Sequence, residues 1–254
     1  MAQQDLVFGQ HAVQSLLQNE SERVFEIFVS KARQNSKKQD EKVNSLVNLA
    51  KKSGIPVHFC HKKTLDEKSK GHPHQGIVAR AKQAPVKTEK DLENLISHVK
   101  EAGNTVTLLL LDGITDPHNL GACMRTADAA GVNAVVVPKD KSVALNATVR
   151  KVASGAADVL PLIRVTNLAR TMRELQDSGI WVIGTAGEAV DNLFDIKSEG
   201  HLAIVMGAED KGMRRLTRET CDQLVKLPVL GSVSSLNVSV ATGICLYELN
   251  RQRR

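Results

Sequence analysis

Residues 106–121, VTLLLLDGITDPHNLG, decide the fold class of the larger part of this chain. The apolar run over residues 106–111 is typical of a strand that is buried on both faces of a parallel sheet. Asp116 is a good N-cap, and Pro117 suits the first position of a helix. The segment therefore predicts a buried strand, a short turn and then a helix.

The same alternation continues toward the C-terminus. Helical patterns cover residues 118–130, 167–177 and 237–250, and further apolar runs lie at residues 134–137, 159–163, 180–184, 202–206 and 224–227. Strands that alternate with helices indicate an α/β domain with a mainly parallel sheet. Ligands of such sheets bind outside the carboxyl ends of the strands, so the candidate site residues are expected there.

The first third of the chain predicts a separate, smaller α/β unit. Its shorter signals indicate helices at residues 11–17 and 38–53 and strands at residues 24–29, 56–60 and 77–81. A charged stretch with a helical pattern in its middle follows. The predicted organisation is a small domain at residues 1–82, a linker at 83–104 and a larger domain at 105–254.

The formal charge of +6 is concentrated in the small domain. Residues 1–82 hold 14 Lys or Arg against 8 Asp or Glu, while residues 105–254 hold 17 against 16. A basic module joined to a nearly neutral one suits a protein that captures a polyanion, although a solvated basic surface explains the charge equally well. Aromatic residues are only 3% of the chain, which argues against base stacking on aromatic platforms.

The composition also excludes several classes of protein. No stretch approaches the roughly 20 apolar residues of a membrane span, and the N-terminus lacks the pattern of a secretion signal. The four cysteines, Cys60, Cys123, Cys221 and Cys245, have no paired spacing and are expected to be reduced thiols. A cytoplasmic protein is the expectation.

Arg125 is the catalytic candidate of the first strand-end segment, residues 112–127. Gly121 and Ala122 lie one turn earlier on the predicted helix and would leave room for a substrate or another chain. Asn119 and Arg125 are separated by roughly 600° of helical rotation, so Asn119 is expected to act from the exposed first turn. A capped helix with a solvated surface arginine explains the same residues.

Two later segments also follow strand ends. In residues 205–215, Gly207 permits close backbone approach to a ligand, and Glu209 can accept hydrogen bonds from ribose or base groups. In residues 227–241, Ser235 and Asn237 precede an apolar helix whose N-terminus can donate to a polar ligand. A structural turn and an ordinary helix cap are the alternatives.

A histidine cluster raises the question of a metal site. His58, His61, His72 and His74 surround Cys60, but their spacing matches no standard zinc pattern and only one thiol is available. A polar loop that faces RNA is the favoured interpretation, and no metal is predicted.

Together, the three strand-end segments resemble the three motifs of the SpoU (TrmH) family of RNA 2′-O-methyltransferases. The resemblance rests on the patterns Asn119-x-Gly121-x-x-x-Arg125, Met206-Gly207-x-Glu209-x-x-Gly212 and Ser235-Leu236-Asn237-Val238-Ser239-x-Ala241, in that order. Near the N-terminus, Phe8-Gly9-x-His11 and His74-Gln75-Gly76-Ile77 resemble the small substrate-binding domain of the branch that modifies ribosomal RNA.

This resemblance implies an α/β fold in two domains and a cofactor. The N-terminal domain would be L30e/L7Ae-like and bind RNA, and the C-terminal domain would be a SPOUT α/β-knot (trefoil knot) with a mainly parallel sheet. The knot would bind S-adenosyl-L-methionine. The cofactor-binding residues carried over are Thr185, Gly187, Met206, Gly207, Leu227, Ser235, Leu236 and Asn237.

The resemblance further implies a homodimer that acts on 23S ribosomal RNA. The modified nucleotide would be a guanosine, namely guanosine 2251 of the peptidyltransferase P loop. A transfer RNA guanosine methyltransferase, a ribosomal RNA adenosine methyltransferase and an RNA-binding protein without activity are the alternatives. The catalytic residues carried over are Arg125, Asn119, Glu209, Ser235 and Asn237.

The same carry-over suggests a role for Arg125. Arginine stays protonated at neutral pH and is therefore a poor base. We expect it to stabilise the alkoxide that develops on the ribose and to position a phosphate, while another group takes the proton.

Overall fold

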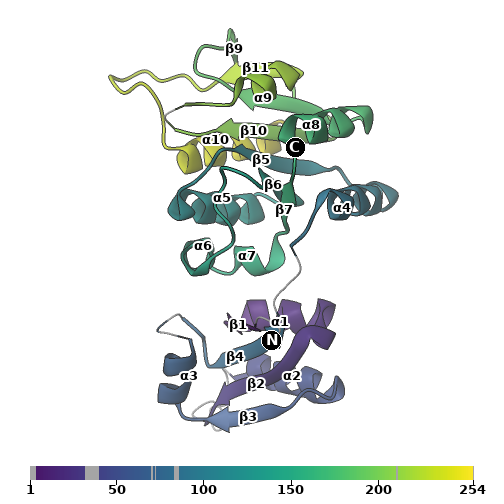
Figure 1. The fold of residues 1–254 in the computed structure, drawn as a ribbon, viewed down its shortest axis with the longest axis vertical. Helices are drawn as coiled ribbons and strands as arrows, with labels where there is room; N and C mark the ends of the chain where they lie inside the picture. Colours follow the sequence, from purple (N-terminus) through teal and green to yellow (C-terminus); the bar gives the residue numbers. More distant parts are fainter. Residues whose placement is uncertain are drawn as a thin grey trace. The chain divides into compact units, whose positions relative to one another are not determined.

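The computed structural model describes residues 4–31, 40–69, 71, 73–82, 86–209 and 211–253. The chain divides into two compact units, Met1–Pro85 (unit 1) and Val86–Arg254 (unit 2), and Figure 1 labels the elements of both. The predicted boundary at residue 82 lies three residues before this division, and residues 83–85 lie outside the described part.

Unit 1 is a small α/β unit with a four-stranded mixed sheet. Its elements are β1 (Gln4–Phe8), α1 (Gln10–Asn19), a 3-10 turn (Ser21–Arg23), β2 (Val24–Ser30), α2 (Asp40–Lys52), β3 (Val57–Cys60), α3 (Lys62–Lys68) and β4 (Ile77–Lys82). The strand order is β1-β4-β2-β3, with β3 parallel to β2 and the other two pairs antiparallel. Helices α1 and α2 cover one face of the sheet and share its apolar core.

The prediction for unit 1 missed two elements. The two helices and three strands that the sequence indicated are all present, whereas β1 and α3 were not predicted. Helix α3 is short and polar, and it has a single fully buried apolar side chain, Leu65, so its periodicity is weak.

Unit 2 is built on a seven-stranded sheet in which every pair is parallel. The elements are α4 (Glu89–Glu101), β5 (Thr107–Asp112), α5 (Pro117–Ala129), β6 (Ala134–Pro138), α6 (Ala147–Ala153), α7 (Ala156–Val159), β7 (Leu162–Val165), α8 (Leu168–Asp177), β8 (Trp181–Thr185), β9 (Asp191–Asn192), β10 (Leu202–Gly207), α9 (Arg215–Thr220), β11 (Gln223–Lys226) and α10 (Val238–Gln252). The strand order is β7-β6-β5-β10-β8-β11-β9.

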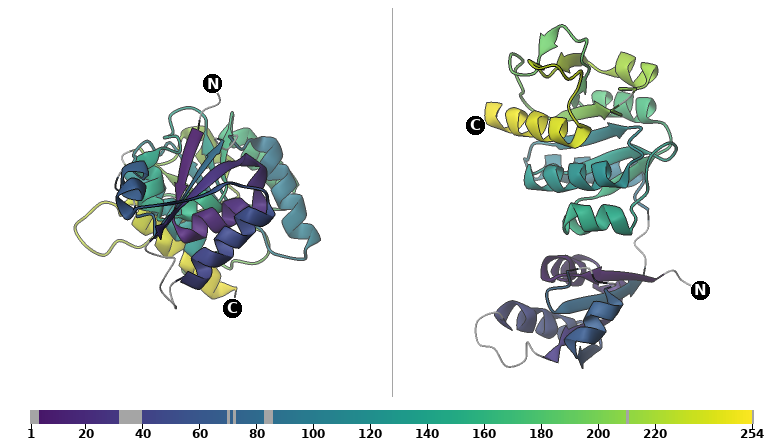
Figure 2. Two further views of the ribbon diagram at one scale, coloured as in Figure 1. Left: turned by 90° about the horizontal axis from the view of Figure 1, so that it is seen from below. Right: turned by 90° about the vertical axis from the view of Figure 1, so that its left-hand side faces the viewer.

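Both faces of this sheet are covered by helices. On β5, Leu109 and Leu111 pack with residues of α5, α6 and α10, while Leu108 and Leu110 pack with residues of α4 and α8. All four leucines are fully buried, which explains why β5 is a continuous apolar run. After β11 the chain returns to α10, which packs against α5 and β10, and Figure 2 shows α10 beside α5.

Two sequence predictions for unit 2 differ from the structure in detail. The strand predicted at residues 159–163 begins only at Leu162, because residues 156–159 form α7. The short elements α6, α9 and β9 were not predicted.

The helical pattern predicted in the middle of the linker is confirmed by α4. A capping box between Thr88 and Asp91 starts this helix, and its Leu92 and Ile96 join the core of unit 2.

Gly121 has a different role from the one predicted. A Cβ atom at this position would lie 2.7 Å from the Val152 Cβ atom and 2.8 Å from the Val149 carbonyl oxygen. The space beside Gly121 is therefore filled by α6, and the prediction that it leaves room for a substrate is wrong. The glycine allows α5 and α6 to pack closely.

None of the helices in the described ranges is long and apolar enough to cross a membrane.

Candidate functional site

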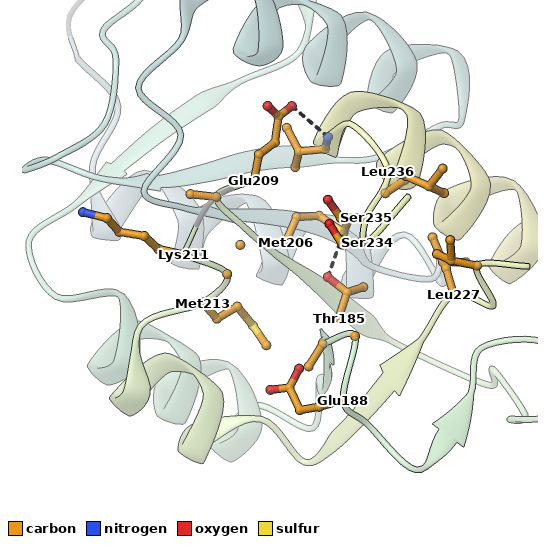
Figure 3. Close-up of a pocket in the computed structure, with 18 of the residues that line it drawn as sticks. Thr185, Glu188, Met206, Glu209, Lys211, Met213, Leu227, Ser234, Ser235 and Leu236 are labelled. Carbon is orange, nitrogen blue, oxygen red and sulfur yellow. Dashed lines mark hydrogen bonds between the residues drawn. The ribbon is translucent and has the colours of Figure 1, made fainter. Parts of the chain in front are cut away.

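A cavity of about 400 Å³ opens at the carboxyl ends of β8, β10 and β11. Its walls come from the loops that follow these strands and from the start of α10. Figure 3 shows Leu227 and Leu236 on one wall and Lys211 and Met213 on the opposite one. The cavity is lined by Thr185, Ala186, Gly187, Glu188, Met206, Gly207, Ala208, Glu209, Lys211, Gly212, Met213, Arg218, Leu227, Val229, Ser234, Ser235, Leu236, Val238 and Ala241.

Most of the residues expected to bind the cofactor line this cavity. Seven of them do so, and Asn237 is the exception. The seven are Thr185, Gly187, Met206, Gly207, Leu227, Ser235 and Leu236. Thr185 Oγ1 donates a hydrogen bond of 3.1 Å to the Val205 carbonyl oxygen, which ties the loop after β8 to β10.

Gly207 ends β10 at a point where a side chain has no space. A Cβ atom there would lie 2.2 Å from both the Gly212 carbonyl carbon and the Met213 nitrogen. Ala208 and Gly212 close the turn with two backbone hydrogen bonds of 3.1 and 2.8 Å. The backbone of this turn thus packs directly against Gly207. The sequence predicted that a ligand would approach the backbone closely here, whereas Gly212 and Met213 make the close approach at the Cβ position.

Glu209 is the hydrogen-bonding centre beside the cavity. Its Oε1 atom accepts hydrogen bonds from Asn119 Nδ2 at 3.0 Å, from the Val238 backbone N–H at 3.2 Å and from Asn237 Nδ2. Asn237 Nδ2 also donates to Asn119 Oδ1 at 3.0 Å. Asn119 and Asn237, which lie 90 and 28 positions from Glu209 in the sequence, therefore meet at one carboxylate oxygen. Figure 3 shows the hydrogen bond from the start of α10 to this oxygen.

The first turns of α5 and α10 place two of these residues, Asn119 and Asn237. Asp116 caps α5 by accepting from the His118 backbone N–H at 2.9 Å, which leaves Asn119 in the first turn as predicted. Asn237 caps α10 by accepting from the Ser239 backbone N–H at 2.9 Å. The cap predicted at Asn237 is thus present, and the same side chain reaches Glu209.

Arg125 lies apart from this network. It is exposed on the third turn of α5, and it makes no hydrogen bond or ion pair with any residue that the structure describes. Ser235 is also exposed, but it lines the cavity. The structure therefore brings Asn119, Glu209 and Asn237 together and leaves Arg125 without a polar partner among the described residues.

Sequence reasoning missed several polar residues at this edge. Glu188 and Arg218 form an ion pair on the cavity wall, and Lys211 lies near its mouth. The carboxylate of Asp112, at the end of β5, is fully buried; its Oδ2 atom accepts from the Arg214 backbone N–H at 2.8 Å. The rule that sites lie at strand ends could have singled out both Asp112 and Glu188.

The histidine cluster of unit 1 has partners other than a metal. His74 Nε2 lies 2.9 Å from Asp66 Oδ1, and His58 Nε2 lies 2.9 Å from Glu26 Oε2. His72 lies outside the described residues. Among the residues that can be placed, no three His, Cys, Asp or Glu side chains gather as a metal site.

Comparison with known proteins identifies the family. The SpoU rRNA Methylase family matches residues 106–247, and the RNA 2′-O ribose methyltransferase substrate binding family matches residues 6–86. The chain is 56% identical over 250 residues to the 23S rRNA (guanosine-2′-O-)-methyltransferase RlmB of Photobacterium profundum, with 98% of each chain covered. It is 55% identical to the RlmB of Escherichia coli, with 98% of this chain and 99% of the relative covered.

This chain belongs to the SpoU rRNA methylase family. A crystal structure of the SpoU methyltransferase AviRb from Streptomyces viridochromogenes in complex with AdoMet has a TM-score of 0.75 and 22% identity, covering 98% of this chain and 90% of that chain. That likeness shows the shared fold. The predicted membership of the SpoU family and the predicted two-domain α/β fold are confirmed.

Proposed function

We propose that this SpoU family member transfers a methyl group from S-adenosyl-L-methionine to a ribose 2′-hydroxyl of 23S ribosomal RNA in the cytoplasm. The observation that carries the proposal is the convergence of Asn119, Glu209 and Asn237 beside one cavity, because each comes from a different segment that resembles a family motif. RlmB relatives that are more than half identical to this chain are named as 23S rRNA guanosine 2′-O-methyltransferases. Guanosine 2251 is the nucleotide that we propose.

The cavity has the size and lining that S-adenosylmethionine requires. Its volume of about 400 Å³ falls in the usual range for small-molecule sites. Met206, Leu227 and Leu236 offer apolar walls for a purine, while the hydroxyl groups of Thr185 and Ser235 offer polar contacts. When bound, the cofactor supplies an electrophilic methyl group on a sulfonium.

Arg125 is proposed to hold the RNA at the reacting ribose. Its guanidinium is exposed and has no polar partner in the described part of the chain, so it can pair with a phosphate in two parallel hydrogen bonds and stabilise negative charge on the attacking oxygen. Since arginine stays protonated at neutral pH, the proton of the 2′-hydroxyl goes to another group. Glu209 and Asn119, already fixed against α10, are proposed to orient the ribose.

A homodimer is proposed on the evidence of α10. Val240, Ile244 and Tyr247 repeat at helical spacing on this helix and are 52%, 36% and 56% exposed. An apolar stripe of this kind is typical of a surface that a second helix covers. Replacing Ile244 and Tyr247 with glutamate should give a monomer in sedimentation velocity experiments; a dimer that persists would contradict this interface.

The proposed reaction can be tested with purified protein and methyl-labelled S-adenosylmethionine. Unmodified 23S ribosomal RNA and bulk transfer RNA are offered separately, and primer extension at limiting nucleotide locates any 2′-O-methyl group. Label at a single guanosine of 23S RNA supports the proposal. Label at an adenosine of 23S RNA would identify the chain as a ribosomal RNA adenosine methyltransferase. Label on transfer RNA alone would identify it as a transfer RNA methyltransferase.

The absence of label would have a separate meaning. If the protein binds S-adenosylmethionine and RNA in calorimetry but transfers no methyl group to 23S RNA, either free or in ribosomal precursor particles, the proposed activity is wrong. The chain would then be an RNA-binding protein without catalysis.

A further inference from the structure

The second face of the sheet of unit 1 carries several exposed side chains among the described residues. Helices α1 and α2 pack on the face formed by Ile27 and its neighbours, whereas α3 alone, among the helices that the structure describes in this unit, packs on the opposite face. We call this opposite side the outward face. Its exposed or half-buried side chains on β2, β3 and β4 are Phe25, Glu26, Phe28, His58, Cys60, Arg80 and Lys82.

Aromatic rings gather on the outward face. The Phe28 and His58 rings are stacked, with centroids 5.5 Å apart and planes inclined by 27°. Phe25 is 42% exposed because a bulge between Val24 and Glu26 turns it out of the sheet. Two stacking positions result, one on His58 backed by Phe28 and the other on Phe25. Phe25 and Phe28 are three residues apart along β2, which corresponds to about 10 Å of extended strand.

Positive charge lies next to both positions. The Lys68 ammonium of α3 lies 4.0 Å from the centre of the Phe28 ring, and the Arg80 guanidinium lies 5.8 Å from that of Phe25. Glu26 is the acidic residue of this face on β2, β3 and β4, and its carboxylate is paired with both Arg80 and His58. Helix α3 adds three lysines, Lys62, Lys63 and Lys68, against Asp66 and Glu67. With the charge of Glu26 compensated, the excess of lysines on α3 and the exposed Lys82 leave the face positive.

We infer that the outward face binds a single-stranded segment of the substrate RNA, with bases stacked on His58 and Phe25 and phosphates held by Lys68 and Lys82. Stacked aromatic side chains beside cations are what unpaired bases and their backbone require. The positive excess of the chain, which falls within residues 1–82, favours a polyanion over a neutral partner on this surface. The inference rests on the proposed function, because it assumes that RNA is the substrate.

The low aromatic content had argued against such a surface. Five phenylalanines in 254 residues predict no stacking platform on average. The structure, however, places Phe25 and Phe28 on the same face of one strand, with His58 beside them. A small number of rings is sufficient to form a stacking surface for bases when the rings share one face of the sheet.

The test compares RNA binding by the full-length protein and three variants. Phe25→Ala, His58→Ala and the double variant are measured by fluorescence anisotropy with a short fluorescein-labelled single-stranded RNA, and with a duplex of the same sequence. We expect Kd for the single strand to rise about tenfold for each ring removed, and about a hundredfold in the double variant. Kd for the duplex should change little, because paired bases are not free to stack.

Matched controls separate stacking from general damage. Trp181→Ala removes an aromatic side chain that is 51% exposed at the amino end of β8, and it should leave both affinities unchanged. Phe25→Trp keeps a ring and should restore wild-type affinity or exceed it. Lys82→Ala should instead reduce the salt dependence of binding by about one ion.

Several outcomes would overturn the inference. Unchanged Kd in the double variant would remove the outward face from RNA binding, and equal losses for single strand and duplex would remove stacking as the cause. Binding is measured without methyl transfer, so these results are distinct from a failure of the proposed activity. If wild-type protein methylates 23S RNA, the double variant should raise the KM for RNA at unchanged kcat.

Discussion

The cavity of unit 2 and the outward face of unit 1 are built in opposite ways. At the cavity, loops from three parallel strands fold inward, and Glu209 gathers three donors at one oxygen atom. On the outward face, rings and cations lie side by side on the surface of a sheet. A reacting atom requires fixed geometry, whereas a long polymer requires area and charge. This contrast predicts that substitutions near the cavity affect rate and cofactor binding, and that substitutions on the outward face affect RNA affinity.

Gly207→Ala should produce the largest effect. The new Cβ atom would meet backbone atoms at 2.2 Å, so the turn must open, at a cost of about 3 kcal/mol in the free energy of unfolding. Calorimetry should show that S-adenosylmethionine binding is lost. Gly231→Ala is the matched control, because its Cβ atom meets no protein atom within 4 Å and the residue does not line the cavity, and its stability should change by less than about 0.5 kcal/mol. Equal behaviour of the two variants would contradict the role of the tight turn.

Arg125→Lys should have the next largest effect, and it should lower kcat without changing stability or cofactor binding. Lysine keeps the charge but loses the planar fork, so we expect kcat to fall about a hundredfold. The melting temperature and the Kd for S-adenosylmethionine should stay at wild-type values, because Arg125 is exposed and contacts no described polar group. Arg173→Lys, an exposed arginine on α8, is the control. A near-wild-type kcat for Arg125→Lys would contradict the positioning role.

Glu209→Ala should reduce both stability and activity. The substitution leaves two asparagine side chains and the Val238 N–H without their acceptor, which costs about 1 kcal/mol at a partly solvated site. Glu219→Ala removes a carboxylate that is 53% exposed and pairs with Arg215 on the same helix, so it should cost no more than about 0.5 kcal/mol. Urea denaturation would measure both values, and equal losses would mean that the network at Glu209 adds no stability.

The smallest expected effect is a difference in the reactivity of the thiols of the two units toward an alkylating reagent. Burial raises the pKa of Cys123 to about 11 and the pKa values of Cys221 and Cys245 to about 12. At pH 8 very little of these thiols is ionised, and thiolate would accumulate only as the pH rises past 10. Burial also raises the pKa of Cys60, but Lys68 and Lys31 oppose this shift. Mass spectrometry after iodoacetamide treatment at pH 8 should therefore find Cys60 modified first.

The same contrast explains which features could be predicted from the sequence. The strand-end segments could be predicted because a buried parallel strand such as β5 is apolar throughout, and because Asp116 and Asn237 are typical caps. The cavity-lining residues followed from those segments together with the family resemblance.

Features that depend on packing between distant segments could not be predicted. Gly121 looked like an opening for a ligand, but α6, which was not predicted, occupies that space. The three-way contact at Glu209 joins residues up to 90 positions apart, and no local pattern encodes it. The outward face was missed because composition averages over the chain and does not report which strand positions face the same side.

The dependence of Glu209 on α10 has a consequence for biosynthesis. The carboxylate is held by Asn237 and Val238, which begin α10, so the ribosome must translate past these residues before this contact can form. Domains generally fold in order of synthesis, and unit 1 can fold while unit 2 is still emerging. A nascent chain therefore can associate with RNA early, but it stays unable to react until α10 has been translated.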